Sequence, residues 1–281
     1  MVMRRGPLRL VHALAQSGFD ASAAKRYNAV RPGYAQEAVT YALKALPKQD
    51  SLNLLEIGAG TGKFTRHLLQ ELGMCKGKVK LLAVEPSEGF RSELQRTTPP
   101  PPANVELAVH YGTGSSLPVA EKHECDGVYV AQAFHWMAND DTLLEVHRVL
   151  KPNAPLVCVW NALDVDVDWI KELEENIIDR FYDPPETPRY LSMKWRSAFE
   201  TPIAKSLFAK PTRWFGGLQT SYVTSHDVWE RVQSISVIHS LSDHAKQAVR
   251  EQVLELTKRV PQVDGRIKIV YKSEVAIARR L

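Results

Sequence analysis

The chain has 281 residues, of which 44% are hydrophobic and 24% charged, with a formal net charge of +4 at pH 7. This length suffices for a full α/β core with an additional subdomain, and no apolar run approaches the roughly 20 residues that span a bilayer, so we expect a soluble protein without membrane contact. Three of the 36 basic residues precede Asp20, which leaves 33 basic against 32 acidic residues, and this nearly neutral body argues against a nucleic-acid partner.

The first 19 residues contain three arginines and no acidic residue. Both a short N-terminal extension and a mitochondrial transit peptide have this composition. We expect an extension over residues 1–18, a single domain over residues 19–281, and a cytoplasmic protein, with a mitochondrial location as the alternative. The three cysteines lack C-x-x-C spacing, which indicates a reducing compartment and no metal site; they are Cys75, Cys125 and Cys158.

Residues 53–66, NLLEIGAGTGKFTR, predict a strand, a tight loop and a helix. An apolar run containing Glu56 ends in three alternating glycines, Gly58, Gly60 and Gly62. Glycines at every second position remove the Cβ atoms that would keep a flat ligand from the backbone, and they admit positive φ where the chain reverses. The loop is therefore expected to bind a ligand.

The spacing of the glycines distinguishes between the kinds of nucleotide-binding site that could use such a loop. A phosphate-binding P-loop would require Gly in place of Ile57 and a hydroxyl residue in place of Phe64. A dinucleotide fingerprint, G-x-G-x-x-G, would require Gly in place of Lys63. Both alternatives are disfavoured.

Further along the chain, a second buried strand ends in Glu85, 23 residues after Gly62. An acid at that place accepts hydrogen bonds from ribose hydroxyls. The tetraproline 99–102 predicts a stiff surface loop.

A fourth strand begins at Asp126, and the apolar spacing with a proline stop predicts a helix over residues 140–150. A fifth strand is expected over 156–161, helices over 225–240 and 242–260, and a closing strand over about 266–278.

The glycine pattern E-x-G-x-G-x-G resembles motif I of class I S-adenosylmethionine (SAM) dependent methyltransferases. Two further segments match this family, the Q-A-x-H-W sequence at Gln132–Trp136 and the N-terminal pattern F…Y…RPxY, which is formed by Phe19, Tyr27, Arg31, Pro32 and Tyr34. The chain is similar to the small-molecule methyltransferases of methyltransferase type 11, of the trans-aconitate and UbiE-like kind. This resemblance covers nearly the whole chain.

The resemblance implies an α/β fold of Rossmann-like class I methyltransferase type, with a seven-stranded, mostly parallel sheet, helices on both faces and an α-rich lid inserted after the fifth strand. It places a SAM-binding core at 50–161 and a substrate lid at about 162–260. Twelve of the 23 aromatic residues fall between Trp160 and Trp229, which fits a cap over a pocket.

SAM is the implied cofactor and S-adenosylhomocysteine the implied product. Glu85 is expected to bind the ribose and Glu56 to order the loop or meet the methionine amine. At the adenine, Ser115 stands where the family usually has an acid, so backbone groups there are alternatives. The cofactor-binding residues implied by the resemblance are Tyr27, Arg31, Glu56, Gly58, Ala59, Gly60, Thr61, Gly62, Glu85, Pro86, Thr113, Gly114, Ser115 and Gln132.

For the acceptor, His135 is a candidate general base or a packing histidine, and Trp136, Trp195 and Arg196 are candidate substrate contacts. The expected reaction is methyl transfer to a small molecule by in-line displacement. The alternatives are a non-catalytic SAM-fold partner protein and a nucleic-acid or protein methyltransferase. The tetrapeptide at 183–186 resembles the D-P-P-Y box of DNA methyltransferases but lacks its aromatic residue and its place after the fourth strand.

Overall fold

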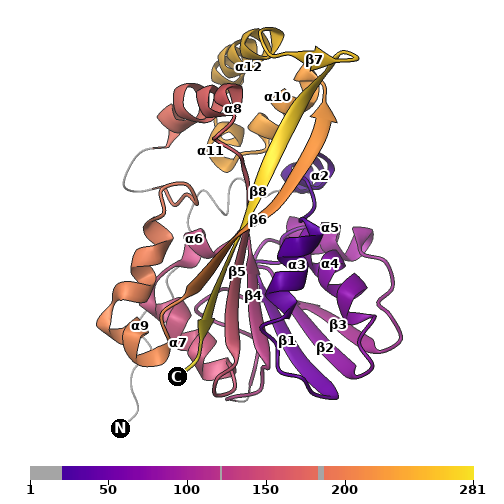
Figure 1. Cartoon of the computed structure of the whole chain (residues 1–281), viewed down its shortest axis with the longest axis vertical. Coiled ribbons are helices and arrows are strands. Elements are labelled where there is room, and N and C mark those ends of the chain that lie inside the picture. Colours follow the sequence, from indigo (N-terminus) through magenta and orange to yellow (C-terminus); the bar gives the residue numbers. More distant parts are fainter. Residues whose placement is uncertain (1–20, 121, 183–186) are drawn as a thin grey trace.

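The computed structural model describes residues 21–120, 122–182 and 187–281. The predicted extension over 1–18, Phe19 of the N-terminal pattern and the tetrapeptide at 183–186 lie outside the described residues. Figure 1 shows a sheet flanked by helices, with a smaller helical lobe beyond one end of the strands. Two long strands, β6 and β8, extend from the sheet into that lobe.

A mixed sheet in the order β3-β2-β1-β4-β5-β8-β6 forms the centre of the fold, and the two-residue β7 pairs with β8. Strands β1 to β5 are parallel, whereas β8 runs antiparallel to both β5 and β6. The predicted seven-stranded, mostly parallel sheet is confirmed. The strands are β1 Ser51–Ile57, β2 Lys78–Val84, β3 Val105–His110, β4 Gly127–Ala131, β5 Pro155–Leu163, β6 Thr212–Val223, β7 Gln262–Val263 and β8 Arg266–Arg279.

Helices cover both faces of the sheet, as expected. On one face, α3 and α4 bury apolar side chains such as Ala38 and Leu68 against β1, β2 and β4. On the other face, Val146 of α7 and Phe199 pack against β4 and β5. These helices are α3 Gln36–Leu43, α4 Lys63–Leu72, α5 Glu88–Thr97, α6 Phe134–Met137, α7 Asp140–Val149, the 3₁₀ helix η3 Lys194–Glu200 and α9 Pro202–Leu207.

The lobe has an apolar core of its own, which includes Ile170, Val228 and Val253. The range 162–260, assigned from the sequence to one lid, also contains the main-sheet strand β6. None of the residues of β6 is fully buried, so the strand gives only a weak apolar signal. The lobe helices are α8 Asp168–Glu172, the π-helix η1 Leu173–Ile178, the 3₁₀ helix η2 Asp179–Phe181, α10 Ser225–Gln233, α11 Ser236–His239 and α12 Asp243–Lys258.

Helix α2, Ala21–Val30, connects the sheet domain to the lobe (Figure 1). Its Asn28 amide donates to Glu93 of α5 at 3.1 Å. Its Arg26 lies 3.5 Å from Glu230 of α10. Residues just after α2 are thereby held where the two parts of the molecule meet. Across the described residues, the helices are all too short or too polar to cross a membrane.

Candidate active site

The glycine loop begins where β1 ends. The backbone N–H groups of Gly58 and Ala59 both donate to the carbonyl oxygen of Val84, at 2.8 and 3.1 Å, which ties the loop to the end of β2. Gly58, Gly60 and Gly62 have φ values of 68°, 60° and 79°. Glycine adopts this left-handed region without a Cβ clash, so the alternating pattern is explained by backbone geometry.

The three glycines differ in what a side chain would meet. A Cβ atom at Gly58 would lie 2.6 Å from Cβ of Ala133, and one at Gly62 would lie 2.8 Å from Cγ of Leu94. A Cβ atom at Gly60 would come no closer than 3.8 Å to a protein atom, at Phe90. Gly58 and Gly62 are therefore required by packing, whereas the space in front of Gly60 is free for a ligand.

Glu85 follows β2 and faces the loop. Its carboxylate accepts hydrogen bonds from the backbone N–H of Gly60 at 3.0 Å and of Ser87 at 2.9 Å. Burial raises the pKa of this carboxyl to about 7, although both hydrogen bonds act to lower it. The side chain is only 6% exposed, yet it contributes to a cavity wall.

Glu56 of β1 is more deeply buried. The hydroxyl of Thr65 donates to its Oε2 atom at 2.6 Å, while its Oε1 atom has no partner among the described residues. Burial raises the pKa of this carboxyl to about 8. An unpartnered carboxyl oxygen is unfavourable inside a protein unless a ligand supplies a donor.

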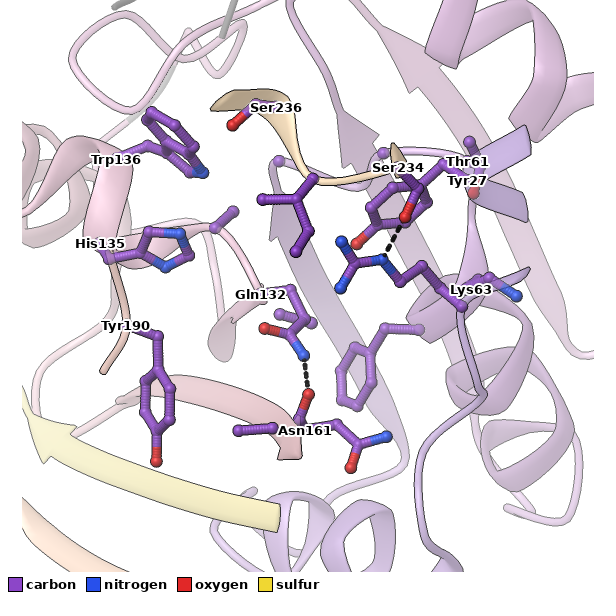
Figure 2. Close-up of a pocket in the computed structure, with 18 of the residues that line it drawn as sticks. Tyr27, Thr61, Lys63, Gln132, His135, Trp136, Asn161, Tyr190, Ser234 and Ser236 are labelled. Atoms are coloured by element: carbon purple, nitrogen blue, oxygen red, sulfur yellow. Dashed lines mark hydrogen bonds between the residues drawn. The ribbon is translucent and has the colours of Figure 1, made fainter. Parts of the chain in front are cut away.

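A cavity of about 260 Å³ opens at the carboxyl ends of β1, β2 and β4 and extends beneath the lobe. Figure 2 shows side chains from the sheet domain and from the lobe around this cavity. Most of the site residues expected from the sequence line it. They are Tyr27, Arg31, Glu56, Gly58, Ala59, Gly60, Thr61, Glu85, Pro86, Gln132, His135 and Trp136.

Gln132 stands at the turn after β4 in a conformation unusual for a residue with a side chain. Its φ is 56°, its backbone N–H donates to Val159 at 2.8 Å, and its side-chain amide donates to the backbone oxygen of Asn161 (Figure 2). Positive φ at a non-glycine residue is costly and is concentrated at functional sites. The two hydrogen bonds hold Gln132 at the cavity wall.

The segment proposed for adenine does not line the cavity. Thr113 and Ser116 exchange backbone hydrogen bonds of 3.0 and 3.1 Å. A Cβ atom at Gly114 would lie 2.7 Å from Sδ of Met137. The cavity wall does not include Thr113, Gly114 or Ser115, and it does not include Gly62. Their cofactor contacts remain predictions.

Trp195 and Arg196 also lie away from the cavity wall. Trp195 is 3% exposed and its ring centroid is 4.2 Å from that of Trp160, within the core on one face of the sheet. The guanidinium of Arg196 lies over Trp195 and 3.9 Å from the Glu274 carboxylate. Their role in acceptor binding remains a prediction, and the position of Trp195 indicates a packing role.

Two arginines line the cavity without a carboxylate partner among the described residues. The Nε atom of Arg31 donates to the Ser234 hydroxyl at 2.9 Å, and Nε of Arg231 donates to the Tyr271 hydroxyl at 3.2 Å. Arg231 is 6% exposed, and its Nη1 atom is buried without a partner. Burial lowers the pKa of Arg31, and the neighbouring charge of Arg231 lowers it further. This part of the cavity is suited to an anion.

Sequence reasoning missed the cavity residues that the lobe contributes, such as Arg231, Tyr182 and Tyr190. One signal was available: Arg231 lies three residues after Val228, on the apolar side of α10, where a charged residue is unusual. It also missed Lys63, whose pKa burial lowers to about 8. The two tyrosines lie in irregular segments, so no periodic pattern identified them.

His135 of α6 contributes to the cavity wall beside Trp136 and Tyr190 (Figure 2). The indole Nε1–H of Trp160 donates to Nδ1 of His135 at 3.3 Å. Burial lowers the pKa of His135 to about 3, so its imidazole is neutral at physiological pH. Its role as a general base is not supported by this low basicity.

Comparison with known proteins agrees with this geometry. The methyltransferase domain family matches residues 55–158, from β1 into β5. An uncharacterized methyltransferase-like protein of Schizosaccharomyces pombe is 29% identical, covering 88% of this chain and 90% of its own length. An uncharacterized methyltransferase of Mycobacterium tuberculosis is 34% identical over 58% of this chain and 60% of its own length.

Solved structures share the fold at low sequence identity. A candidate type II methyltransferase of Anaeromyxobacter dehalogenans superposes with a TM-score of 0.56 at 17% identity, covering 89% of this chain and 97% of that protein. A candidate methyltransferase of Bacillus halodurans gives 0.50 at 16% identity, covering 86% and 97%. The strand order, the glycine loop and these relatives show that the chain contains a methyltransferase domain with a Rossmann-like fold, similar to the class I S-adenosylmethionine-dependent methyltransferases.

Proposed function

We propose that this methyltransferase binds SAM in the cavity described above and transfers its methyl group to a small-molecule acceptor that carries a negative charge. The observation that carries the proposal is the convergence of the glycine loop, Glu85 and the unpartnered oxygen of Glu56 on one cavity at the carboxyl ends of the strands. Ligands of open α/β sheets bind at this edge.

The residues present fit each part of SAM. The open space before Gly60 accommodates a ligand close to the backbone, and Glu85 has the lone pairs to accept ribose hydroxyls. The free Oε1 atom of Glu56 matches a cationic amine. Arg31, which lies over the ring of Tyr27, suffices for the single carboxylate of the methionine part and leaves Arg231 for the acceptor.

SAM supplies a methyl group on a sulfonium, which is already activated for attack. What the chain contributes is alignment and exclusion of water: the lobe covers the open edge of the sheet, and Tyr27 packs against Phe90 with ring centroids 5.7 Å apart. No step requires a strong base from the protein when the acceptor is already ionised.

The second arginine supports the anionic acceptor. After one guanidinium is matched to the cofactor carboxylate, the other is still without a negative partner among the described residues. A buried guanidinium whose charge is not balanced is unfavourable, and a carboxylate or phosphate would balance it and accept two parallel hydrogen bonds.

Calorimetric titration with S-adenosylhomocysteine tests the cofactor assignment. We expect Glu85→Ala to weaken binding by roughly a hundredfold or more, because two hydrogen bonds to a charged group contribute about 1.5–3 kcal/mol each. Glu106→Ala, which changes an exposed acid on β3, is the matched control and should bind normally. Equal affinity of the two variants would refute the assignment.

Catalysis is tested separately by following labelled methyl groups from SAM into a filtered extract of small metabolites. Incorporation into anionic products supports the proposal. Tight cofactor binding without any incorporation would favour the alternative of a non-catalytic partner protein.

A further inference from the structure

One hydrogen bond determines which nitrogen of His135 carries the proton. Trp160 of β5 is fully buried, and its indole nitrogen lies 3.3 Å from Nδ1 of His135. Indole Nε1–H is a donor only, so Nδ1 must be the acceptor and carries no hydrogen. A neutral imidazole has a single N–H group, which is then on Nε2.

The alternative protonation states do not fit this contact. A charged imidazolium, or a neutral ring protonated on Nδ1, would place two N–H donors against each other. Burial is the cause of the lowered pKa of His135, and no charged neighbour offsets it. The indole cannot turn away easily, because the rings of Trp195 and Tyr190 stack on it at centroid distances of 4.2 and 5.3 Å.

The remaining nitrogen, Nε2, has no partner among the described residues. The imidazole of His135 extends from α6 toward the cavity that Figure 2 shows. Since Nδ1 is occupied by Trp160, Nε2–H is the group that the ring can offer to a ligand. It is a hydrogen-bond donor without a spare lone pair, and it therefore cannot accept a proton.

We propose that Trp160 is a positioning residue that keeps His135 in the neutral Nε2–H form, and that this N–H binds a lone pair of the acceptor molecule. The claim that this N–H binds the acceptor rests on the proposed function, whereas the claim about the protonation state of His135 does not. The site then favours an acceptor that is ionised before it binds. A lone pair of its nucleophilic atom forms the bond to the methyl carbon, the electrons of the carbon–sulfur bond remain on sulfur, and His135 receives no proton.

The protonation state can be read directly by long-range ¹H–¹⁵N correlation on ¹⁵N-labelled protein between pH 5.5 and 8.5, with His135→Gln used to assign the signal. We expect the Nε2–H tautomer without titration. Trp160→Phe keeps an aromatic ring but removes the donor, and should produce the Nδ1–H tautomer or a mixture of the two neutral tautomers. Trp195→Phe is the matched control and should leave the signal unchanged, because the buried Trp195 indole nitrogen has no partner in the part of the chain that the structure describes.

An Nδ1–H tautomer or an imidazolium in the wild-type protein would overturn the inference, and so would an unchanged signal in folded Trp160→Phe. The wild-type spectrum alone establishes the tautomer of His135, even if Trp160→Phe does not fold. Calorimetry with S-adenosylhomocysteine on the same samples separates the two proposals, because loss of cofactor binding would refute the proposed function and leave the tautomer result intact.

The donor role is tested with labelled SAM and the filtered small-metabolite extract as the acceptor source. In His135→Gln the side-chain amide can place an N–H near the position of Nε2, whereas in His135→Asn it can do so only near Nδ1. We expect His135→Gln to retain at least tenfold more methyl transfer than His135→Asn, with equal cofactor affinity. Equal loss in both variants would overturn the donor role of Nε2–H.

Discussion

The two walls of the cavity hold their polar groups in different ways. On the sheet side, Glu56 and Glu85 are fixed by strand ends and accept short hydrogen bonds from Thr65, Gly60 and Ser87. On the lobe side, Arg231 is held by one tyrosine hydroxyl, and its buried Nη1 atom has no partner within residues 21–120, 122–182 and 187–281. The first wall presents two carboxyl groups to the cavity, and the second presents a guanidinium without a carboxylate partner among the described residues.

This difference separates cofactor binding from acceptor choice. The sheet wall depends on backbone geometry that a short sequence segment determines, so it can bind the same cofactor in many proteins of one fold. The lobe wall depends on side chains from segments far apart in the sequence, which can change without altering the glycine loop. Variants on the two walls should therefore have separable effects.

The largest effect is expected at a residue that belongs to neither wall. Trp195→Ala should lower the free energy of unfolding by about 3–5 kcal/mol, because it removes a buried aromatic side chain from the core. Urea denaturation measures this change. The neighbouring Arg196→Ala, at a side chain that is 39% exposed, should change it by less than about 1 kcal/mol.

If Trp195→Ala instead left stability unchanged and abolished methyl transfer with normal cofactor affinity, Trp195 would be part of the acceptor site, as the sequence suggested. The acceptor would then contact η3, and the lobe wall would not be its main binding surface.

A second test compares two glycines of the sheet wall. Alanine at either Gly60 or Gly62 adopts positive φ at a cost of about 1–2 kcal/mol. Gly62→Ala also places a Cβ atom 2.8 Å from Leu94, so thermal unfolding should show the larger loss of stability, about 2–3 kcal/mol. Gly60→Ala has room within the protein, so its main effect should be roughly tenfold weaker binding of S-adenosylhomocysteine. Normal binding by Gly60→Ala would place the cofactor elsewhere.

The sequence predicted the sheet wall better than the lobe wall for a physical reason. The glycine loop and the acids at Glu56 and Glu85 follow from local patterns, since parallel strands bring their carboxyl ends to one edge. The edge strand β6 was assigned to the predicted lid, because none of its residues is fully buried and its apolar pattern is therefore weak. Arg231 reaches the cavity through the packing of α10 against α12 and α2 and through its hydrogen bond to Tyr271 of β8, and only its place on the apolar side of α10 is visible in the local sequence.

A third test exchanges the arginine that the sequence favoured for the one that the structure favours. In protein saturated with S-adenosylhomocysteine, citrate serves as a small anionic probe, and its binding is measured from the shift in melting temperature. We expect Arg231→Met to weaken citrate binding roughly tenfold, because it removes a hydrogen-bonded charge. Arg196→Met should retain the wild-type shift. If only Arg196→Met lost citrate binding, the anion site would lie at η3.

The smallest effect is a pH dependence that belongs to the sheet wall alone. The pKa of Glu85 is about 7 and that of Glu56 about 8, both raised by burial above the ordinary value of 4.5. The native state then binds protons more tightly than the unfolded chain, so these groups make the free protein less stable as pH rises from about 5 to about 8. Cofactor binding requires ionised Glu85, so the affinity for the cofactor should rise as pH rises.

Between pH 8 and pH 6, the ionised fraction of a group with a pKa of about 7 falls roughly tenfold, so the part of the affinity for S-adenosylhomocysteine that depends on Glu85 should fall by up to about tenfold. Calorimetry at constant ionic strength measures this change, and Glu85→Gln should bind weakly with a much flatter pH profile. An affinity that stays constant in the wild-type protein would mean that the loop N–H of Gly60 and the N–H of Ser87 keep Glu85 ionised at pH 6. In that case these backbone hydrogen bonds outweigh burial at this carboxylate.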